Sequence, residues 1–192
     1  MKRSGLTLAA VTAAVVTLMV VTLVTVTIRR RPPRVDTSAS ATTPAGQQVF
    51  GRKIKARLYY VSMDGTRLTG VDREVSYSEG STALAQQIVN AQLAPVPAGL
   101  VSAIPLGTTL RAFFLTEKGD AIVDLSKEAS TAHSGGSLNE LLTVYTIVNA
   151  LTANLPAVKS VQLLVDGKQV DTLAGHINLR KPFQKNLAII EP

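Results

Sequence analysis

The sequence predicts an α+β fold: a two-layer sandwich with two helices on one face of a small, mostly antiparallel or mixed sheet, preceded by one transmembrane helix. Three observations support this prediction. An uncharged run covers residues 6–28, strand-like and helix-like segments alternate between residues 49 and 183, and an apolar-striped helix from Ser137 leads directly into a strand. Helices that follow pairs of strands in this order are typical of a two-layer α+β domain.

The N-terminal segment is predicted to be an uncleaved membrane anchor. Residues 6–28 contain no charged residue, and this run is longer than the about 20 residues that a helix needs to cross the hydrocarbon core. A cleaved signal peptide would have a shorter apolar core followed at once by small residues. Here arginines follow, and Ala39–Ala41 lies too far downstream. We therefore expect residues 6–28 to form a single pass through the cytoplasmic membrane.

Residues 29–48 are predicted to be a linker, because arginines give way to Pro, Ser and Thr without apolar periodicity. A flexible coil of this length separates its ends by about 20–25 Å. The predicted organisation of the whole chain is a short basic N-terminus (1–5), the transmembrane helix (6–28), the linker (29–48), a folded domain (49–183) and a C-terminal tail (184–192).

The positive charge of the chain does not predict nucleic-acid binding. The formal net charge is +7, from 20 basic and 13 acidic residues. Six of the basic residues and one acid flank the uncharged run, which leaves 14 basic and 12 acidic residues from Thr37 onward. A nucleic-acid module would carry its excess charge on the folded domain. The chain also has no cysteine, which excludes disulfides, Cys-ligated metals and a lipid-modified cysteine.

The first half of the domain is predicted to be a hairpin followed by a helix. Apolar and polar residues alternate over 54–60 and again over 71–77, with Asp64-Gly65 as a turn between them. Ser81 is a candidate cap for a helix that starts at Thr82 and ends before Pro95.

The second half is predicted to repeat this pattern. Strands cover 110–115 and 121–125, separated by a turn. A long helix then starts at Ser137, which forms a capping box with Glu140, and stops at Pro156. A strand over 161–165 follows, and Asp166-Gly167 predicts a hairpin to one more strand. The helix carries an apolar stripe of Leu138, Leu141, Leu142, Tyr145, Val148, Leu151 and Leu155.

No residue pattern in the chain predicts catalysis, a cofactor or a metal. His133 lies in a polar loop and His176 in a predicted hairpin or strand, each without a second ligand at metal-binding spacing. Asp120 and Asp124 are interpreted as a turn carboxylate and a strand-end carboxylate. We therefore predict that the protein is not an enzyme.

One candidate ligand site remains. The segment Ser134, Gly135, Gly136 and Ser137 precedes the long helix, whose free N–H groups and dipole could hold an anion. No lysine follows as it would in a phosphate-binding loop.

Four motifs resemble the GerMN domain family of sporulation and spore germination. They are LYYVSMDGTRLTGVDREV (58–75), GLVSAIPLGTTL (99–110), AIVDLS (121–126) and GSLNELLTVYTIVNALTANLPAVKSVQLLVDG (136–167). The resemblance covers about residues 53–183 and implies a compact α+β domain akin to ring-building modules of secretion and sporulation complexes. It also implies a non-enzymatic role in a bacterial envelope. Many members of that family are lipoproteins. This chain differs from them, because it has no cysteine to carry the lipid.

The sequence and the resemblance together predict a membrane-anchored, non-catalytic cell-envelope protein. Its GerMN-like domain would mediate protein–protein interaction or self-assembly, linked to sporulation or germination, with no cofactor and no nucleic-acid partner. The alternative is an anchored, extracytoplasmic ligand- or peptidoglycan-binding module. That alternative requires a concave patch with exposed aromatic residues, and the chain has four Tyr and four Phe.

The orientation of the anchor is a conflict between two rules. Lys2 and Arg3 precede the anchor and four arginines follow it, so the positive-inside rule favours a cytoplasmic C-terminal domain. Long segments translocate largely regardless of charge, however, and 164 residues follow Ile28. With the family resemblance, we predict that the C-terminal domain is extracytoplasmic.

Overall fold

The computed structural model describes residues 51–192. The predicted N-terminus (1–5), transmembrane helix (6–28) and linker (29–48) lie outside the described residues. Within residues 51–192, no helix has both the length and the apolar character needed to cross a membrane.

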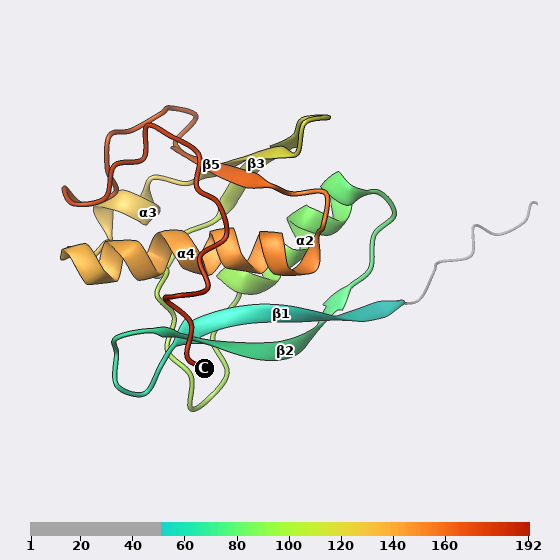
Figure 1. Ribbon diagram of the computed structural model, residues 1–192, viewed down its shortest axis with the longest axis horizontal. Coiled ribbons are helices and arrows are strands. Elements are labelled where there is room, and N and C mark those ends of the chain that lie inside the picture. The colour runs from blue at the N-terminus through green and yellow to red at the C-terminus, as the bar shows by residue number, and fades with distance from the viewer. Residues whose placement is uncertain (1–50) are drawn as a thin grey trace, which may run out of the picture. The chain divides into compact units, whose positions relative to one another are not determined.

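The described chain has five strands and three helices, which confirms the α+β class (Figure 1). In chain order they are β1 (Lys53–Val61), β2 (Leu68–Ser76), α2 (Ser81–Leu93), β3 (Leu110–Leu115), β4 (Asp120–Leu125), the short α3 (Glu128–Thr131), α4 (Ser137–Asn154) and β5 (Ser160–Val165). The strand predicted after Asp166-Gly167 is absent. Those two residues form a tight turn at φ 53° and 76°, closed by backbone hydrogen bonds between Val165 and Lys168. An irregular C-terminal segment follows.

The strands form two sheets, so the prediction of helices on one face of a single sheet was wrong. β1 and β2 make an antiparallel hairpin, whereas β4 pairs antiparallel with β3 and parallel with β5. Figure 1 shows α2 and α4 between the hairpin and the three-stranded sheet. The reason lies in α4, in which ten of 18 residues are buried. A helix whose buried residues lie on more than one side requires cover on each of those sides.

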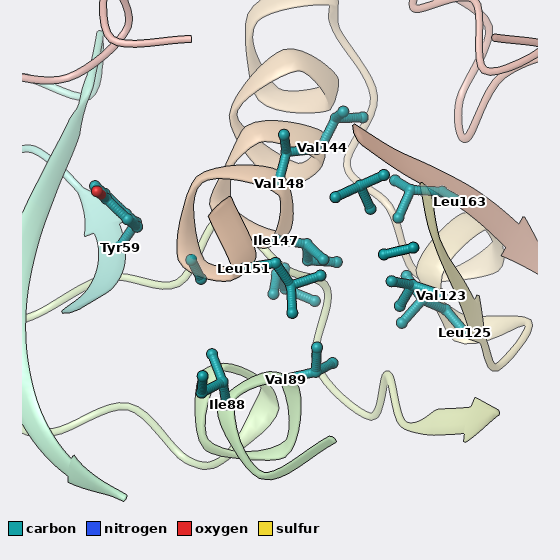
Figure 2. Packing of buried hydrophobic residues seen from close by; sticks show 14 of the residues in the cluster. Tyr59, Ile88, Val89, Val123, Leu125, Val144, Ile147, Val148, Leu151 and Leu163 are labelled. Carbon is teal, nitrogen blue, oxygen red and sulfur yellow. The ribbon is translucent and has the colours of Figure 1, made fainter. Parts of the chain in front are cut away.

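The core is centred on the C-terminal half of α4. In Figure 2, Ile147 and Leu151 lie between Tyr59 of β1 on one side and Val123 of β4 on the other, with α2 beneath them. The predicted apolar stripe is confirmed for four of its members, which are fully or almost fully buried: Leu142, Val148, Leu151 and Leu155. Leu138 is 41% exposed instead, because the first three residues of α4 face the solvent.

Both long helices begin after a glycine, and the predicted serine caps were wrong. Gly80 precedes α2 at φ 84° and Gly136 precedes α4 at φ 89°, and neither helix has a side-chain cap. Glycine adopts positive φ without steric cost, so it can set the direction in which the chain enters a helix. The side chain of Glu140 turns into the protein instead of back toward Ser137.

Two amide side chains join the hairpin to the helices. Asn154, at the end of α4, accepts a hydrogen bond from the Arg57 N–H and donates one to the Arg57 carbonyl, both at 2.8 Å. Gln92 of α2 makes the same pair of bonds to Tyr59, at 2.9 and 2.8 Å. These amides bond to the outward backbone groups of Arg57 and Tyr59 on β1 and fix the hairpin against the helix layer.

Candidate functional site

The segment before α4, predicted as an anion site, is held together by its own hydrogen bonds. The Gly135 N–H donates to Nδ1 of His133 at 2.9 Å, and the Asn139 amide donates to the Gly135 carbonyl at 3.0 Å. Nε2 of His133 lies 3.0 Å from Oγ1 of Thr143. Burial lowers the pKa of His133, more than the nearby carboxylate of Glu140 raises it. A neutral imidazole suits these contacts, because its Nδ1 accepts a hydrogen bond.

Glu140 places a buried, hydrogen-bonded carboxylate in the first turn of α4. Its side chain is fully buried, and it accepts hydrogen bonds from the N–H groups of Leu173 at 2.6 Å and His176 at 2.9 Å. Nδ1 of His176 lies 3.5 Å from the same carboxylate. Burial by itself raises the pKa of Glu140, but hydrogen bonds from the backbone of residues 173–177 outweigh it and hold the pKa below its ordinary value.

This arrangement bears directly on an anion at Ser134, Gly135, Gly136 and Ser137. An ionised carboxylate in the first turn already interacts with the positive end of the helix dipole. It also repels a second anion at the same place. The candidate anion site therefore stays a prediction. The helix dipole would stabilise a bound anion most at the first turn of α4, and the carboxylate of Glu140 already lies there.

Two cavities lie beside the start of α4. One, of about 220 Å³, is lined by Val61, Gly65, Val101, Ser102, Ala103, Ser134, Asn139 and Leu142. The other, of about 310 Å³, is lined by Thr66, Arg67, Leu138, Leu141, Asn186, Ala188 and Ile189. The β1–β2 turn and the beginning of α4 contribute to both, so the two cavities belong to one end of the domain.

Four exposed apolar side chains lie in segments that line these cavities, and we call them together the α4 end surface: Met63, Val101, Leu138 and Leu187. Val101 and Leu138 line the cavities themselves. Met63 lies in the turn between β1 and β2, and Leu187 lies between two lining residues of the larger cavity. Exposed apolar residues gathered at one end of a folded domain are candidates for an interaction surface.

Each part of the α4 end surface is fixed by a specific contact. The Val61 N–H bonds to the Val101 carbonyl at 2.9 Å. The buried amide of Asn149 exchanges two hydrogen bonds with the backbone of Asn186, at 2.9 and 3.0 Å, which places Leu187 beside α4. These hydrogen bonds hold the segments that carry Val101 and Leu187 in place.

The turn that carries Met63 is organised by Asp64. Hydrogen bonds from the Ser62 hydroxyl, the Thr66 N–H and the Thr66 hydroxyl lower the pKa of Asp64 to about 2. Arg67, at the other end of the turn, donates to the Ala188 carbonyl at 3.2 Å. The rim of the α4 end surface thus has one fixed negative and one positive charge around an apolar centre, an arrangement common at protein interfaces.

A further cavity, of about 490 Å³, lies between the end of α2 and the loop that precedes β3. Its lining is Leu93, Ala94, Pro95, Val96, Ser102, Ile104, Pro105, Leu106, Gly107, Thr108 and Thr109. No titratable and no aromatic side chain is among them. It therefore offers no acid–base chemistry and no stacking surface for a sugar ring.

The remaining polar residues singled out in the sequence have structural contacts. Asp120 accepts a hydrogen bond from the Ser160 hydroxyl at 2.6 Å. Asp124 accepts one from the Gly167 N–H at 2.8 Å and lies 3.4 Å from Nε of Arg111. Across residues 51–192, no group of three or more His, Cys, Asp or Glu residues is placed to hold a metal ion.

Sequence reasoning missed two residues that shape this end of the domain. Glu140 was interpreted as part of a helix cap. An acidic residue beside an apolar stripe instead indicates a buried carboxylate that has hydrogen-bond donors elsewhere in the fold. Asn149 was overlooked, although an amide among Ile147, Val148 and Leu151 is the comparable signal. A buried polar side chain requires hydrogen bonds, and in both cases the C-terminal segment supplies them.

Comparison with known proteins places this fold in a family. The family model described as "Germane: Sporulation and spore germination" matches residues 57–171. Among solved structures, a candidate lipoprotein from Clostridium perfringens is 29% identical, with a TM-score of 0.50, and the match covers 69% of this chain and 88% of that one. No curated protein matches the chain.

Two structures of the Bacillus subtilis sporulation protein GerM share the fold at 18% identity. Its first GerMN domain matches with a TM-score of 0.53, over 70% of this chain and 98% of that one. Its tandem GerMN domains match with a TM-score of 0.51, over 70% of this chain and 46% of that one. The family match spans more than half of the sequence, and the chain therefore belongs to the GerMN (Germane) family.

Proposed function

We propose that the protein is a membrane-anchored, non-catalytic cell-envelope protein whose GerMN domain binds another envelope protein through the α4 end surface. The observation that carries this proposal is the grouping of Met63, Val101, Leu138 and Leu187 around two cavities at one end of the domain. Burial of exposed apolar area against a partner is the main favourable term in most protein association. The description of the family links this role to sporulation or germination.

The contacts of Glu140 and His133 support binding rather than catalysis. Glu140 and His133 have their hydrogen-bonding capacity taken up by the fold. A general acid or base requires a free position within reach of a substrate proton. The cavities beside α4 are lined mainly by apolar and neutral polar side chains.

The peptidoglycan-binding alternative has less support. A sugar ring is held by an aromatic face, and the large exposed apolar residues in the described part of the chain include one aromatic residue, Phe114 on β3. Phe114 lies outside the three cavities described above. We therefore do not assign a glycan to any of them.

Mutation of the α4 end surface tests the binding proposal. We expect Leu138→Glu to abolish crosslinking of the full-length, membrane-inserted protein to its partner through a photo-crosslinker at Met63. The change adds a charge at the centre of an apolar contact, where desolvating it is costly. Phe114→Glu is the matched control, because Phe114 is 59% exposed but lies on β3, outside this surface.

The mass of the crosslinked product identifies the occupant. A product of this chain with a different protein supports the proposal. A product with twice the mass of this chain would assign the surface to self-assembly. Crosslinking that survives Leu138→Glu, or that Phe114→Glu abolishes equally, would contradict the proposed surface.

The proposal also places the domain outside the cytoplasmic membrane. The Clostridium perfringens relative is a candidate lipoprotein, and we infer that residues 6–28 replace a lipid anchor in this cysteine-free chain. We expect alkaline phosphatase fused after Pro192 to be active, because the enzyme requires export. A β-galactosidase fusion at the same point is the control. An active β-galactosidase fusion with inactive phosphatase would place the domain in the cytoplasm, as the charge count favours.

A further inference from the structure

The two outer edges of the β1–β2 hairpin differ in how their backbone groups are used. The Tyr77 N–H donates to the Arg52 carbonyl and the Ser62 N–H to the Arg67 carbonyl, at 2.8 and 2.9 Å. Hydrogen bonding alternates along an antiparallel pair. With the register of the hairpin, odd-numbered residues of β2 therefore bond to β1, and even-numbered residues of β2 direct their N–H and C=O groups away from it.

The outer edge of β1 is occupied over most of its length. Asn154 bonds to Arg57, Gln92 bonds to Tyr59, and the Val101 carbonyl accepts from the Val61 N–H. No strand could be added at these positions without displacing side chains or chain that already bond there.

Among residues 51–192, the outer edge of β2 is occupied only at the first residue of the strand. The Leu68 N–H donates to Ile189 and the Leu68 carbonyl accepts from Glu191, both at 2.8 Å. Beyond that point, the outward N–H and C=O groups of Gly70, Asp72, Glu74 and Ser76 have no hydrogen-bond partner among residues 51–192. In Figure 1, most of β2 lies on the far side of β1 from α4. Such a row of free backbone groups is a template for another strand.

This edge differs from the outer edge of β3, which is also a sheet edge. β3 has six residues, and its pairing with β4 shifts register between Leu110 and Ala112. A register shift bends a strand and interrupts its row of backbone groups. β2 has nine residues in continuous register, so its edge can accept a longer partner.

The side chains along the β2 edge favour a basic partner. Asp72 and Glu74 lie on one face of the strand, and their side chains are 58% and 66% exposed. Asp72 pairs with Arg57 at 3.1 Å and Glu74 with Lys53 at 2.9 Å, and Lys55 lies opposite Glu74 in the register of the hairpin. All three cations are on β1, on the side away from the open edge. On the opposite face lie Val71 and Arg73, both half-buried, and Val75, buried, with Arg73 donating to the Tyr60 hydroxyl at 3.1 Å. Opposite charges at cross-strand positions stabilise a sheet.

A second copy of this chain fits the edge poorly. Antiparallel pairing of two β2 edges would place Asp72 against Asp72 or Glu74 of the other copy. Like charges directly opposite one another destabilise a strand pair. The charge pattern therefore selects a segment with positive charges at alternate positions.

We propose that the Gly70–Ser76 edge of β2 is a docking site for an extended segment of a partner protein, with Lys or Arg at alternate positions and apolar residues between them. The segment adds a third strand to the hairpin, and its backbone bonds to Gly70, Asp72, Glu74 and Ser76. Its basic side chains face Asp72 and Glu74, and its apolar side chains face Val71. The edge and the α4 end surface are different sites.

A synthetic peptide of alternating Lys and Val, seven residues long and capped at both ends, is a direct probe. We expect it to slow hydrogen–deuterium exchange of the Gly70, Asp72, Glu74 and Ser76 amides in the full-length chain in non-ionic detergent. A matched peptide of alternating Glu and Val should bind about tenfold more weakly, because two cross-strand attractions become repulsions. The double variant Asp72→Lys/Glu74→Lys should reverse this preference.

Asp72→Pro tests the backbone bonds separately from the charges. Proline removes only the outward N–H of residue 72, so the bonds between β2 and β1 remain, and edge strands tolerate it. We expect this variant to lose binding of the Lys–Val peptide, whereas Asp72→Asn keeps backbone pairing and weakens binding only a few-fold. If Asp72→Pro lowers the folded fraction, N-methylation of the peptide at alternate residues removes bonds from the other partner.

Several results would overturn the proposal. One is equal binding of the N-methylated and unmodified peptides, and another is no slowing of exchange at the four amides with millimolar peptide. Protection present without peptide, and lost when Arg29, Arg30, Arg31 and Arg34 are changed to Ser, would mean that the chain's own linker occupies the edge. Self-association abolished by Asp72→Lys/Glu74→Lys would mean a second copy. Leu138→Glu should bind the peptide normally, so this test stands apart from that of the α4 end surface.

Discussion

Replacing Glu140 with glutamine should lower the free energy of unfolding by about 3 kcal/mol at neutral pH, since each hydrogen bond to a buried charged group contributes about 1.5–3 kcal/mol. Glu140 is fully buried and accepts from Leu173 and His176 with different carboxylate oxygens. Glutamine keeps one of these acceptors and turns an N–H₂ group toward the other N–H. The measurement is thermal unfolding of the full-length chain in detergent. Glu79→Gln is the control, because Glu79 is exposed.

The stabilities of the wild type and of Glu140→Gln should also depend differently on pH. The pKa of Glu140 is held below its ordinary value in the folded state. The stabilisation is therefore present above the pKa of a glutamate in the unfolded chain, about 4.3, and is lost as the pH falls through the lower, folded-state pKa. The difference between wild type and Glu140→Gln should be full at pH 7 and shrink in acid. Two results would show that the carboxylate does not hold residues 173–177. One is an equal loss of unfolding free energy in Glu140→Gln and Glu79→Gln, and the other is a stability difference between wild type and Glu140→Gln that grows in acid.

The second large effect is expected in the core. Leu142→Ala should cost about 2–5 kcal/mol, the range for truncating a buried leucine to alanine. Leu142 is 1% exposed on α4, and it also forms the inner wall of the 220 Å³ cavity. Its removal enlarges that space, and the neighbouring helix and strands can relax only partly to fill it.

Leu138→Ala is the matched control for this substitution. It lies one turn earlier on the same helix and makes the same chemical change, but Leu138 is 41% exposed. We expect it to cost less than about 1 kcal/mol, as for most surface substitutions. Urea unfolding of both variants in the same detergent measures the difference. Similar costs for the two variants would mean that the start of α4 buries a different face.

The sequence by itself determined the local elements. Alternating apolar residues gave β1, β2, β4 and β5 within a few residues of their observed bounds, and the spacing of leucines located α4. Asp64-Gly65 and Asp166-Gly167 form turns as predicted, because glycine adopts the positive φ that they require. These features depend on contacts between residues close in the chain, which is why periodicity and turn chemistry predict them. Family membership was likewise visible in four short motifs, and the family match confirmed it.

Only the tertiary structure decided how these elements assemble. Whether five strands form one sheet or two depends on how many sides of α4 must be covered. The predicted apolar stripe described only one side of this helix. The amide of Asn154 bonds to Arg57 from 97 residues away, and Glu140 to Leu173 from 33. The α4 end surface likewise collects side chains from four separate segments. No local pattern encodes such pairings, because a buried polar or apolar group is satisfied by whichever partner the fold brings to it.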